Sequence, residues 1–428
     1  MRALFFGESP HRIGGAQKSL LAALRHVRRF GLDPIVAFPA GGVYADAVRQ
    51  AGLDVRILEA PAAINTYGKA LLRLAPEQLV STTLREILPF SYQLARLADR
   101  ERCEVMHFNN QRGLILGGLA AAQRGSAAVL HVRGYPSLGR PIWIACHALA
   151  DELICVTERL RSYVAPSRQD HCHVVYNGVD FPESVDRVAA RAWLAELLAE
   201  HGVRLEPGEL VFVSLNTPVP FKGLHHLVEA AGRLTARGIK ARYVLAGTGL
   251  PGDTYQAWLE RRAATLGVGD RIHFVGYVER AIDLVAAADL TLLTSVVRET
   301  FEYDGKVVEL AGEEGLPRSI LESMAVGTPV VATDGGGVRE QLVEGDTGFI
   351  VPPSDAMALA DAIERAARDD VFRAPRRSAA RRCARNSRST PRPRGWFGCS
   401  STPRASDGPL RSARAIWSTS SRTHARIR

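Results

Sequence analysis

The stretch from Glu313 to Gly337, EEGLPRSILESMAVGTPVVATDGGG, decides the fold. Pro317 stands where a first helical residue would, because its fixed φ suits that position and its missing N–H is no loss there. Apolar residues at 320, 321, 324 and 325 give the stripe of a half-buried helix, and Gly327 with a proline two residues on ends it. PVVAT is a wholly apolar strand typical of parallel sheets, and a triple-glycine turn follows. The stretch therefore predicts one loop–helix–strand unit of an open α/β sheet.

Two carboxylates in this stretch are not explained by folding alone. Glu314 lies in the loop that follows an apolar strand at 290–295, and Glu322 lies in the first turns of the helix. Open α/β sheets bind ligands outside the carboxyl ends of their strands, where helix N–H groups point at a phosphate. We therefore expect both carboxylates to face one crevice. The alternative is an ordinary loop glutamate and a solvated helix glutamate.

The rest of the chain repeats the alternation of strand and helix. Seven strand-like runs precede residue 182, and separating segments of helical length favour a parallel, doubly wound sheet: RALFFGE, DPIVAFPA, DVRILE, EVMHFNN, AVLHVRG, ELICVT and HCHVVYN. A second α/β unit begins at 209 with ELVFVSLN. We expect domains at 1–182 and 209–372, a linker at 183–208 and an arginine-rich, non-globular tail at 373–428.

Glu314-x7-Glu322, inside EGLPRSILESMAVGTPVVATDGGG, resembles the E-x7-E signature of retaining glycosyltransferases of family 4 (glycosyl transferases group 1). The resemblance covers residues 1–372 and is strongest over 222–353. It implies the GT-B fold, in which two facing Rossmann-like doubly wound α/β domains enclose an inter-domain cleft. It also implies a nucleotide-sugar donor on the C-terminal domain and an acceptor on the N-terminal domain.

Two glycine-containing turns lie where helices are expected to begin. Gly14-Gly15 follows the first strand, and such a turn exposes helix N–H groups to an anion. It resembles the GGAE-type loop of the family, with Gln17 in place of the usual glutamate. Lys222 precedes a second helix, where the resemblance implies a basic clamp on the diphosphate. The arginine that usually stands five or six residues earlier is absent.

Asn216 and Thr217 occupy those positions, and an asparagine donates a hydrogen bond without neutralising charge. We therefore expect weaker donor binding, or compensation by Arg318 or Arg298. The resemblance further implies that Glu314 binds the sugar hydroxyls and Glu322 the ribose hydroxyls, since one carboxylate accepts two hydrogen bonds side by side. The full donor-binding set is Gly14, Gly15, Asn216, Lys222, Gly315, Leu316, Pro317, Arg318, Ser319 and Glu322.

Two histidines each end an expected strand. His131, in LHVRG, matches the family histidine that holds the transferred hexose, although Arg133 stands two residues on and the family's aspartate is missing. His107, in MHFNN, and Arg133 are assigned to the acceptor side. A core or capping role is the alternative for both histidines. The expected catalytic set is Glu314, His131 and Lys222.

The expected activity is metal-independent transfer of a hexose, with retention, from a UDP- or GDP-sugar to a glycan or lipid-linked acceptor in bacterial surface polysaccharide or glycolipid synthesis. No DxD metal signature is present, and the HCH run at 171–173 alternates faces on a strand. A catalytically impaired nucleotide-sugar binder is one alternative. A nicotinamide-dependent enzyme is another, disfavoured because no GxGxxG follows the first strand. We expect no cofactor.

Two insertions accompany this plan. Residues 61–100 mix basic and apolar positions, so either a peripheral membrane contact or an ordinary amphipathic helix pair over the cleft fits them. Residues 295–313 contain Asp304-Gly305 between two alternating runs, which predicts a hairpin flap that shapes the donor pocket.

Net charge and cysteines complete the expectation. Of the net charge of +9, the segment from Arg373 onward carries +14, from fifteen arginines and one aspartate, which leaves −5 for the body. A nucleic-acid partner would rest on that segment alone, and we expect none. We hypothesise that it is frameshifted or unselected; a disordered basic arm is the alternative. Six cysteines without CxxC spacing fit a reducing cytoplasm, with the inner membrane face as a peripheral location.

Overall fold

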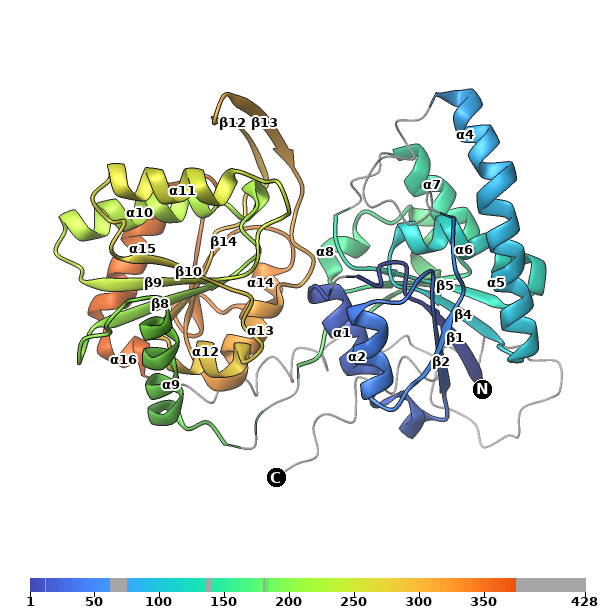
Figure 1. Cartoon of the computed structure of the whole chain (residues 1–428), viewed down its shortest axis with the longest axis horizontal. Coiled ribbons are helices and arrows are strands. Elements are labelled where there is room, and N and C mark those ends of the chain that lie inside the picture. Colours follow the sequence, from blue (N-terminus) through green and yellow to red (C-terminus); the bar gives the residue numbers. More distant parts are fainter. Residues whose placement is uncertain (12, 62–74, 136–139, 180–181, 183, 375–428) are drawn as a thin grey trace. The chain divides into compact units, whose positions relative to one another are not determined.

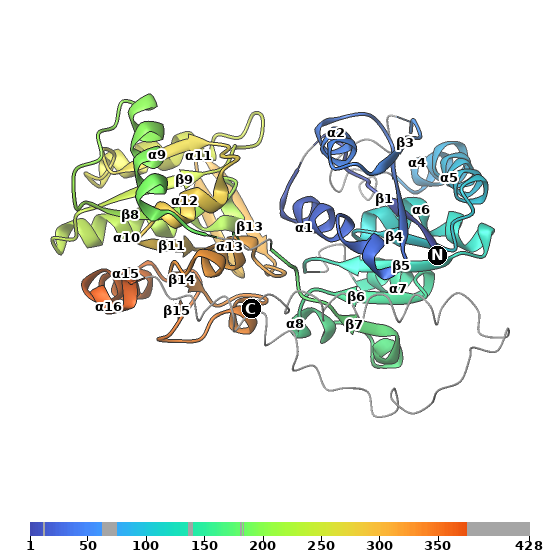
Figure 2. The same cartoon turned by 90° about the horizontal axis from the view of Figure 1, so that it is seen from below.

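The computed structural model describes residues 1–11, 13–61, 75–135, 140–179, 182 and 184–374. Among these residues, Met1–Gly178 form one compact unit (unit 1) and the chain from Val179 to Ala374 forms another (unit 2). Residues 375–428 of the expected tail and 62–74 of the first insertion lie outside the described residues. Each unit is a sheet with helices on both faces (Figures 1 and 2).

Unit 1 contains a seven-stranded sheet in the order β3-β2-β1-β4-β5-β6-β7. Every pair of neighbouring strands is parallel, as the seven apolar runs predict. The order reverses between β1 and β4, which is the switch point of a doubly wound sheet. The strands are β1 (Arg2–Phe6), β2 (Asp33–Phe38), β3 (Asp54–Ile57), β4 (Val105–Phe108), β5 (Ala127–Val132), β6 (Glu152–Cys155) and β7 (Cys172–Val174).

Side-chain alternation along β1 gives unit 1 a core on each face of the sheet. Phe5 packs with residues of α1 and α2, whereas the neighbouring Phe6 ring lies 5.9 Å from that of Phe90 on α5. The helices of unit 1 are α1 (Gly15–Leu24), α2 (Val43–Gln50), α4 (Pro76–Thr82), α5 (Leu88–Arg100), α6 (Gln111–Arg124), α7 (Arg140–Leu149) and α8 (Glu158–Arg161). Shorter turns are η1 (Val27–Phe30), the π-helix η3 (Thr83–Ile87) and η4 (Pro166–His171).

Unit 2 repeats the same topology with a six-stranded sheet in the order β10-β9-β8-β11-β14-β15. All its neighbouring pairs are parallel, and the order reverses between β8 and β11. The strands are β8 (Leu210–Leu215), β9 (Ala241–Ala246), β10 (Ile272–Gly276), β11 (Leu290–Leu293), β14 (Val330–Thr333) and β15 (Gly348–Val351). Strands β8, β11 and β14 confirm the runs expected at 209–216, 290–295 and 329–333.

The helices of unit 2 shift two boundaries that the sequence predicts, the start of α13 and the end of the globular part. Pro317 is the N-cap of α13 and not its first residue, so the helix begins one residue later than expected. Arg373 still belongs to α16, beside the buried Phe372, so the globular part extends past the expected boundary at 373. The elements are α9 (Arg187–Glu200), η5 (Pro220–Lys222), α10 (Leu224–Ala236), α11 (Tyr255–Thr265), α12 (Ala281–Ala287), α13 (Arg318–Val326), α14 (Val338–Gln341), α15 (Ala356–Arg368) and α16 (Asp370–Arg373).

The expected hairpin is confirmed by the antiparallel strands β12 (Arg298–Tyr303) and β13 (Lys306–Ala311), which extend from unit 2 in Figure 1. Asp304 and Gly305 both have positive φ, of 49° and 69°, as a two-residue hairpin turn requires. Within the described part of the chain, no helix is both long enough and apolar enough to cross a bilayer.

The segment expected as a linker contains helix α9, which packs as part of unit 2. Leu194 and Leu198 are fully buried there in one cluster with Leu284 of α12. Arg187, at the start of α9, donates hydrogen bonds to the carbonyl oxygens of Ala286 and Val326 at 3.0 Å each. It also donates to Thr328 Oγ1 at 3.0 Å. One guanidinium therefore ties α9 to the C-terminal ends of α12 and α13.

We predict that Arg187→Ala destabilises unit 2 by about 3 kcal/mol, because several carbonyl groups lose a charged donor at once. Urea unfolding followed by circular dichroism measures the change. Arg204→Ala is the matched control, since that side chain is 87% exposed and should change stability by less than about 0.5 kcal/mol. Equal effects of the two substitutions would contradict the anchoring role.

Candidate functional site

The site in unit 2 lies at the carboxyl ends of β8 and β11, where the strand order reverses. Lys222 follows β8 in the short turn η5. Ser295 lies two residues after the end of β11, and Glu314 follows the hairpin that leaves the same strand. The sheet topology therefore brings together residues that are up to 92 positions apart in sequence.

Lys222 and Glu314 form a short ion pair, with Lys222 Nζ 2.5 Å from Glu314 Oε1. The same oxygen accepts a hydrogen bond from Ser295 Oγ at 2.5 Å. The side chains of Lys222 and Glu314 are 23% and 14% exposed, so the pair is largely shielded from water yet reachable. Thr294 Oγ1 donates to the Lys222 carbonyl oxygen at 2.8 Å and holds the turn in place.

The pKa of Glu314 is set by two opposing effects. Burial by itself raises the pKa of this carboxyl group, because a charge is costly in a low-dielectric surrounding. The charge of Lys222 and the hydrogen bonds from Lys222 and Ser295 outweigh burial, so the pKa lies below its ordinary value of 4.5. Glu314 is therefore a carboxylate at neutral pH and can only accept hydrogen bonds.

The triple-glycine turn supports the Glu314 loop from below. Gly336 has φ +57°, and a Cβ there would lie 1.8 Å from the Glu314 carbonyl oxygen, so only glycine allows the two backbones to approach this closely. Gly337 N donates to the Gly315 oxygen at 2.9 Å, and Gln341 Nε2 donates to the Pro317 oxygen at 3.0 Å. The glycines quoted at the end of the deciding stretch therefore position the glutamate at its start.

Helix α13 begins at this same loop and carries the second glutamate. Glu322 is buried, with its side chain 10% exposed, and its Oε1 accepts hydrogen bonds from Arg318 Nη2 at 3.0 Å and Nε at 3.2 Å. Ser319, in the first turn, is buried. The structure thus places Gly315, Leu316 and Pro317 between the two glutamates at the positive end of the helix dipole.

Asn216 and the Gly14–Gly15 turn have other immediate partners. Asn216 is buried, and its Nδ2 donates to Ser214 Oγ at 2.9 Å, so its amide is engaged by strand β8 and not by the Lys222–Glu314 pair. Gly14 is the N-cap of α1 in unit 1, and its amide donates to Gln17 Oε1 at 3.2 Å. Gln17 therefore makes the reciprocal cap contact that a glutamate makes in a capping box.

Unit 1 gathers a separate polar cluster at the carboxyl ends of β4 and β5. His107 pairs in register with Val129, two residues before His131, so both imidazoles lie on one face of the sheet. His107 Nε2 lies 3.3 Å from His131 Nδ1. Arg133 Nη2 lies 3.2 Å from the same His131 nitrogen. A guanidinium has only donors, so His131 Nδ1 accepts this bond and the ring proton lies on Nε2.

Both histidines are neutral at physiological pH. Burial and, to a lesser extent, the nearby Arg133 charge together lower the pKa of His107 to about 3. Burial, Arg133 and His107 hold the pKa of His131 well below 6.5. These imidazoles therefore act as neutral hydrogen-bonding groups and not as general acids.

Three kinds of residue in the two clusters escaped the sequence prediction. Ser295 completes the Glu314 contacts, and Asn109 Oδ1 and Asn177 Oδ1 accept from Arg133 at 2.6 and 2.7 Å. Glu8 is buried after β1, hydrogen-bonded to Asn110, and burial raises its pKa. Their position just past the carboxyl end of a strand is the signal that could have found them.

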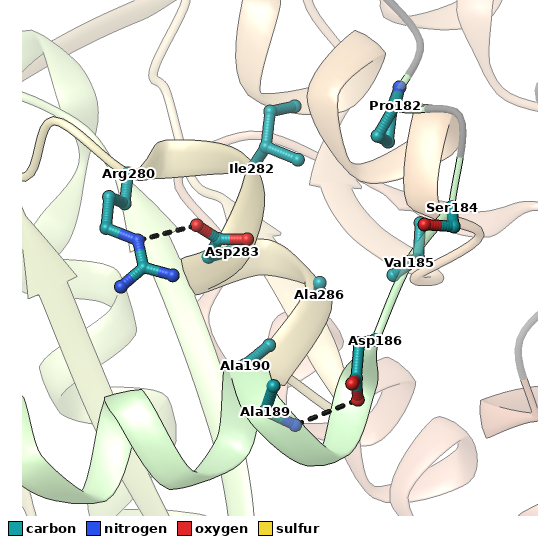
Figure 3. A pocket seen from close by; sticks show the side chains of 10 residues that line it. All are labelled: Pro182, Ser184, Val185, Asp186, Ala189, Ala190, Arg280, Ile282, Asp283 and Ala286. Carbon is teal, nitrogen blue, oxygen red and sulfur yellow. Dashed lines mark hydrogen bonds and ion pairs between the residues drawn. The ribbon is translucent and has the colours of Figure 1, made fainter.

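A pocket of about 270 Å³ in unit 2 is separate from the Lys222–Glu314–Ser295 cluster (Figure 3). It lies between the segment that begins α9 and the start of α12. Asp186 caps α9 by accepting from Ala189 N at 2.9 Å, and Arg280 Nε donates to Asp283 Oδ2 at 2.7 Å. Its charged lining residues are thus engaged in local structure, and we assign it no chemistry.

Two family models match consecutive parts of the chain. Residues 13–182 match the model described as Glycosyltransferase Family 4, and residues 199–390 match Glycosyl transferases group 1. Together they cover both units and most of the chain. The chain belongs to the family 4 (group 1) glycosyltransferases. It is therefore a transferase enzyme by family, as the E-x7-E stretch predicts.

Named relatives of this glycosyltransferase are distant. EpsD of Bacillus subtilis, described provisionally as a glycosyltransferase, is 28% identical over 293 residues, which cover 64% of this chain and 69% of EpsD. The lipopolysaccharide core biosynthesis glycosyltransferase LpsE of Rhizobium meliloti is 32% identical over 163 residues. That match covers 38% of this chain and 41% of LpsE, so it spans less than half the relative's length.

Solved structures confirm the GT-B fold. Anabaena Alr3699/HepE, crystallised in complex with UDP and glucose, superimposes with a TM-score of 0.70. The match covers 91% of this chain and 95% of HepE at 22% sequence identity. Two parallel-sheet α/β domains of this glycosyltransferase therefore correspond to the two Rossmann-like domains that the sequence predicts.

Proposed function

We propose that this glycosyltransferase moves a hexose from a nucleoside diphosphate sugar, held by unit 2, to a glycan or lipid-linked acceptor in bacterial surface polysaccharide or glycolipid synthesis. The observation that carries the proposal is the Lys222–Glu314–Ser295 cluster at the switch point of the second sheet. A cation, a carboxylate and a helix N-terminus meet there, which suits a diphosphate joined to a polyol.

We assign each group in the cluster a role that fits its chemistry and that the family resemblance implies. Lys222 neutralises the diphosphate leaving group, and the N-terminus of α13 adds backbone N–H donors. Glu314 accepts hydrogen bonds from the sugar hydroxyls, and Glu322 accepts those of the ribose. Without a donor, Glu314 Oε1 accepts a hydrogen bond from Lys222. When the donor binds, the Lys222 ammonium shifts toward the phosphate, and Glu314 Oε1 becomes available to the sugar hydroxyls.

The transfer itself needs charge stabilisation and exclusion of water. Departure of the nucleoside diphosphate leaves an oxocarbenium-like centre, and the family resemblance assigns retention of configuration. We propose that Lys222 and helix dipoles supply the positive charge, so that the reaction proceeds without a catalytic metal. In this proposal the His131 Nε2–H donates a hydrogen bond to a hexose hydroxyl oxygen, and His107 and Arg133, on the acceptor side, orient the His131 imidazole.

A lipid-linked acceptor is supported by apolar residues on the surface of unit 1. Val80, Leu84 and Tyr92 follow one another at helical spacing along α4, η3 and α5, and their exposures are 58%, 60% and 55%. Such a stripe can lie against a membrane surface or the lipid part of an acceptor. The name of LpsE, which refers to lipopolysaccharide core synthesis, supports the same acceptor class.

Four described cysteines are free thiols, which supports the cytoplasmic location.

A thermal-shift panel of UDP, GDP, ADP and NADH tests the proposal. Uridine or guanosine diphosphate is expected to raise the melting temperature, because a ligand at 100 times its Kd adds about 2.7 kcal/mol to stability. The nucleotide that binds then selects the sugar donors for a hydrolysis and transfer assay. Stabilisation by NADH alone would contradict the proposal.

The same panel separates the impaired-binder alternative. That alternative is favoured by Asn216, which stands where the family usually has an arginine and whose amide is engaged by Ser214. A shift with UDP or GDP, together with neither hydrolysis nor transfer of any matching sugar, would identify a nucleotide-sugar binder. Slow hydrolysis of one donor in the absence of acceptor identifies the enzyme.

A further inference from the structure

The inner face of strand β12 fastens the hairpin to unit 2. Its residues alternate between exposed and covered, and Glu299, Phe301 and Tyr303 point inward. The Phe301 ring stacks on the His225 imidazole, with ring centroids 4.3 Å apart. The Tyr303 ring lies 5.3 Å from that of Tyr255 on α11. The hairpin therefore lies across the beginnings of α10 and α11.

Three side chains converge at the inner end of this contact. Glu299 Oε1 lies 3.2 Å from His225 Nε2, and Glu299 Oε2 lies 2.9 Å from His226 Nε2. One ligand atom from each residue lies within 4.8 Å of the other two. The three side chains are 9%, 13% and 15% exposed, so the cluster is mostly closed to solvent but not sealed.

We propose that His225, His226 and Glu299 form a zinc site that clips the hairpin to α10. Two imidazoles and one carboxylate are a recognised Zn²⁺ ligand set, and Zn–N and Zn–O bonds of about 2.0–2.2 Å place ligand atoms roughly 3.3 Å apart. The two histidine–glutamate separations, 3.2 and 2.9 Å, are close to that value, and all three ligand atoms lie within 4.8 Å of one another. Imidazole donors disfavour Mg²⁺ and Ca²⁺, which prefer oxygen ligands.

The second layer of contacts is built as metal-ligand histidines require. Tyr255 Oη lies 2.6 Å from His225 Nδ1. This hydrogen bond holds the imidazole so that its other nitrogen, Nε2, is directed at Glu299. Ser354 Oγ donates to Glu299 Oε2 at 2.9 Å and orients the carboxylate. The fourth zinc position is left for water or for the second carboxylate oxygen.

A similar group of one glutamate and two histidines in unit 1 has more exposed imidazoles, as ordinary surface ion pairs do. Glu152 contacts His171 Nδ1 at 3.4 Å and His173 Nε2 at 2.8 Å. Those imidazoles are 42% and 39% exposed. Within the residues that the structure describes, the His225–His226–Glu299 cluster is the one group of three whose ligand atoms all converge.

The zinc site has a consequence for the hairpin and does not depend on the sugar-transfer reaction. Val296 N donates to the Phe221 oxygen at 3.0 Å, and Gly312 N donates to the Val297 oxygen at 2.9 Å, so the base of the hairpin is joined to the Lys222 turn. The zinc ligand His225 lies three residues after Lys222 in the sequence, so zinc fixes the hairpin close to the Lys222 turn. Zinc takes no part in the sugar-transfer chemistry.

Equilibrium dialysis of the full chain against Zn²⁺, in the presence of a non-thiol reductant, tests the site. One equivalent is expected to bind, and His226→Ala and Glu299→Gln should each weaken the affinity by 10-fold or more. Glu302→Gln is the matched control, because Glu302 is exposed on the outer face of the same strand. Zn²⁺ should raise the melting temperature of the wild type and the control only, and Mg²⁺ should raise neither.

Two further measurements keep the test independent of folding defects and of the cysteines. Hydrogen exchange at the β12–β13 amides should slow when Zn²⁺ is added to the wild type but not to Glu299→Gln. Co²⁺ in place of Zn²⁺ should give a spectrum without a thiolate charge-transfer band. Absence of saturable binding, unchanged affinity in both ligand variants, or a thiolate band would overturn the proposal.

Discussion

Replacing Glu314 by alanine is expected to lower the rate of sugar transfer by on the order of 10²-fold or more, with a smaller change in nucleotide affinity. The carboxylate accepts from Lys222 and Ser295 at 2.5 Å each and is positioned by the Gly336 backbone contact. Such a preorganised acceptor matters most when charge develops on the sugar. Initial rates with the donor chosen by the thermal-shift panel measure kcat and KM.

Two further variants distinguish chemistry from folding at this position. Glu314→Gln keeps the side-chain shape and removes the charge, so it should lose nearly as much activity as Glu314→Ala. Glu279→Gln makes the same chemical change at an exposed loop position of unit 2 and should leave the rate unchanged. Near-wild-type transfer by Glu314→Gln would refute the role of the carboxylate.

Replacing Lys222 by methionine is expected to reduce both donor binding and stability. The diphosphate loses its cation, so transfer should fall by on the order of 10²-fold. The buried Glu314 carboxylate loses its charged partner, which should cost about 3 kcal/mol at pH 7. Lys240→Met, at an exposed position after α10, is the matched control and should have neither effect. Urea unfolding and donor titrations measure the two changes.

The stability effect of Lys222→Met should depend on pH in a defined direction. In the wild type the pKa of Glu314 is lowered, so its stabilising contribution is complete above 4.5 and is lost as the pH falls through the lower, folded-state value. Without Lys222, burial raises that pKa and the carboxyl group protonates more readily. The difference between variant and wild type should therefore begin to shrink above pH 4.5, where the variant's carboxyl group protonates, and should go on shrinking as the pH falls below 4.5. A difference that stays constant over that range would contradict the ion-pair explanation.

Local sequence patterns determined most of the fold and named half of the candidate site. The apolar-rich runs predict the strands of both sheets, because they are short, are bounded by turn residues and alternate with segments of helical length. Asp304-Gly305 encodes the hairpin turn, and Gly327 encodes the end of α13 through its positive φ of 77°. The deciding stretch also named Glu314 and Glu322, since their spacing within loop and helix is a local property.

Only the tertiary structure decided what those residues contact. Glu314 meets Lys222 and Ser295 because the sheet order places β8 beside β11, and no local pattern states that order. Asn216 donates to Ser214 Oγ two residues earlier in the chain, and its expected contact with the donor stays a prediction.

The helix α9, expected as a linker, is fixed to unit 2 by Arg187 contacts that span up to 141 residues. The local sequence around His225 and His226 predicts only a helix. The folded hairpin brings Glu299, 73 positions after His226, into contact with them. Backbone preferences and apolar periodicity are properties of neighbouring residues, so a sequence displays them directly. Contacts between distant side chains depend on how whole elements pack, so they emerge only when the chain is folded.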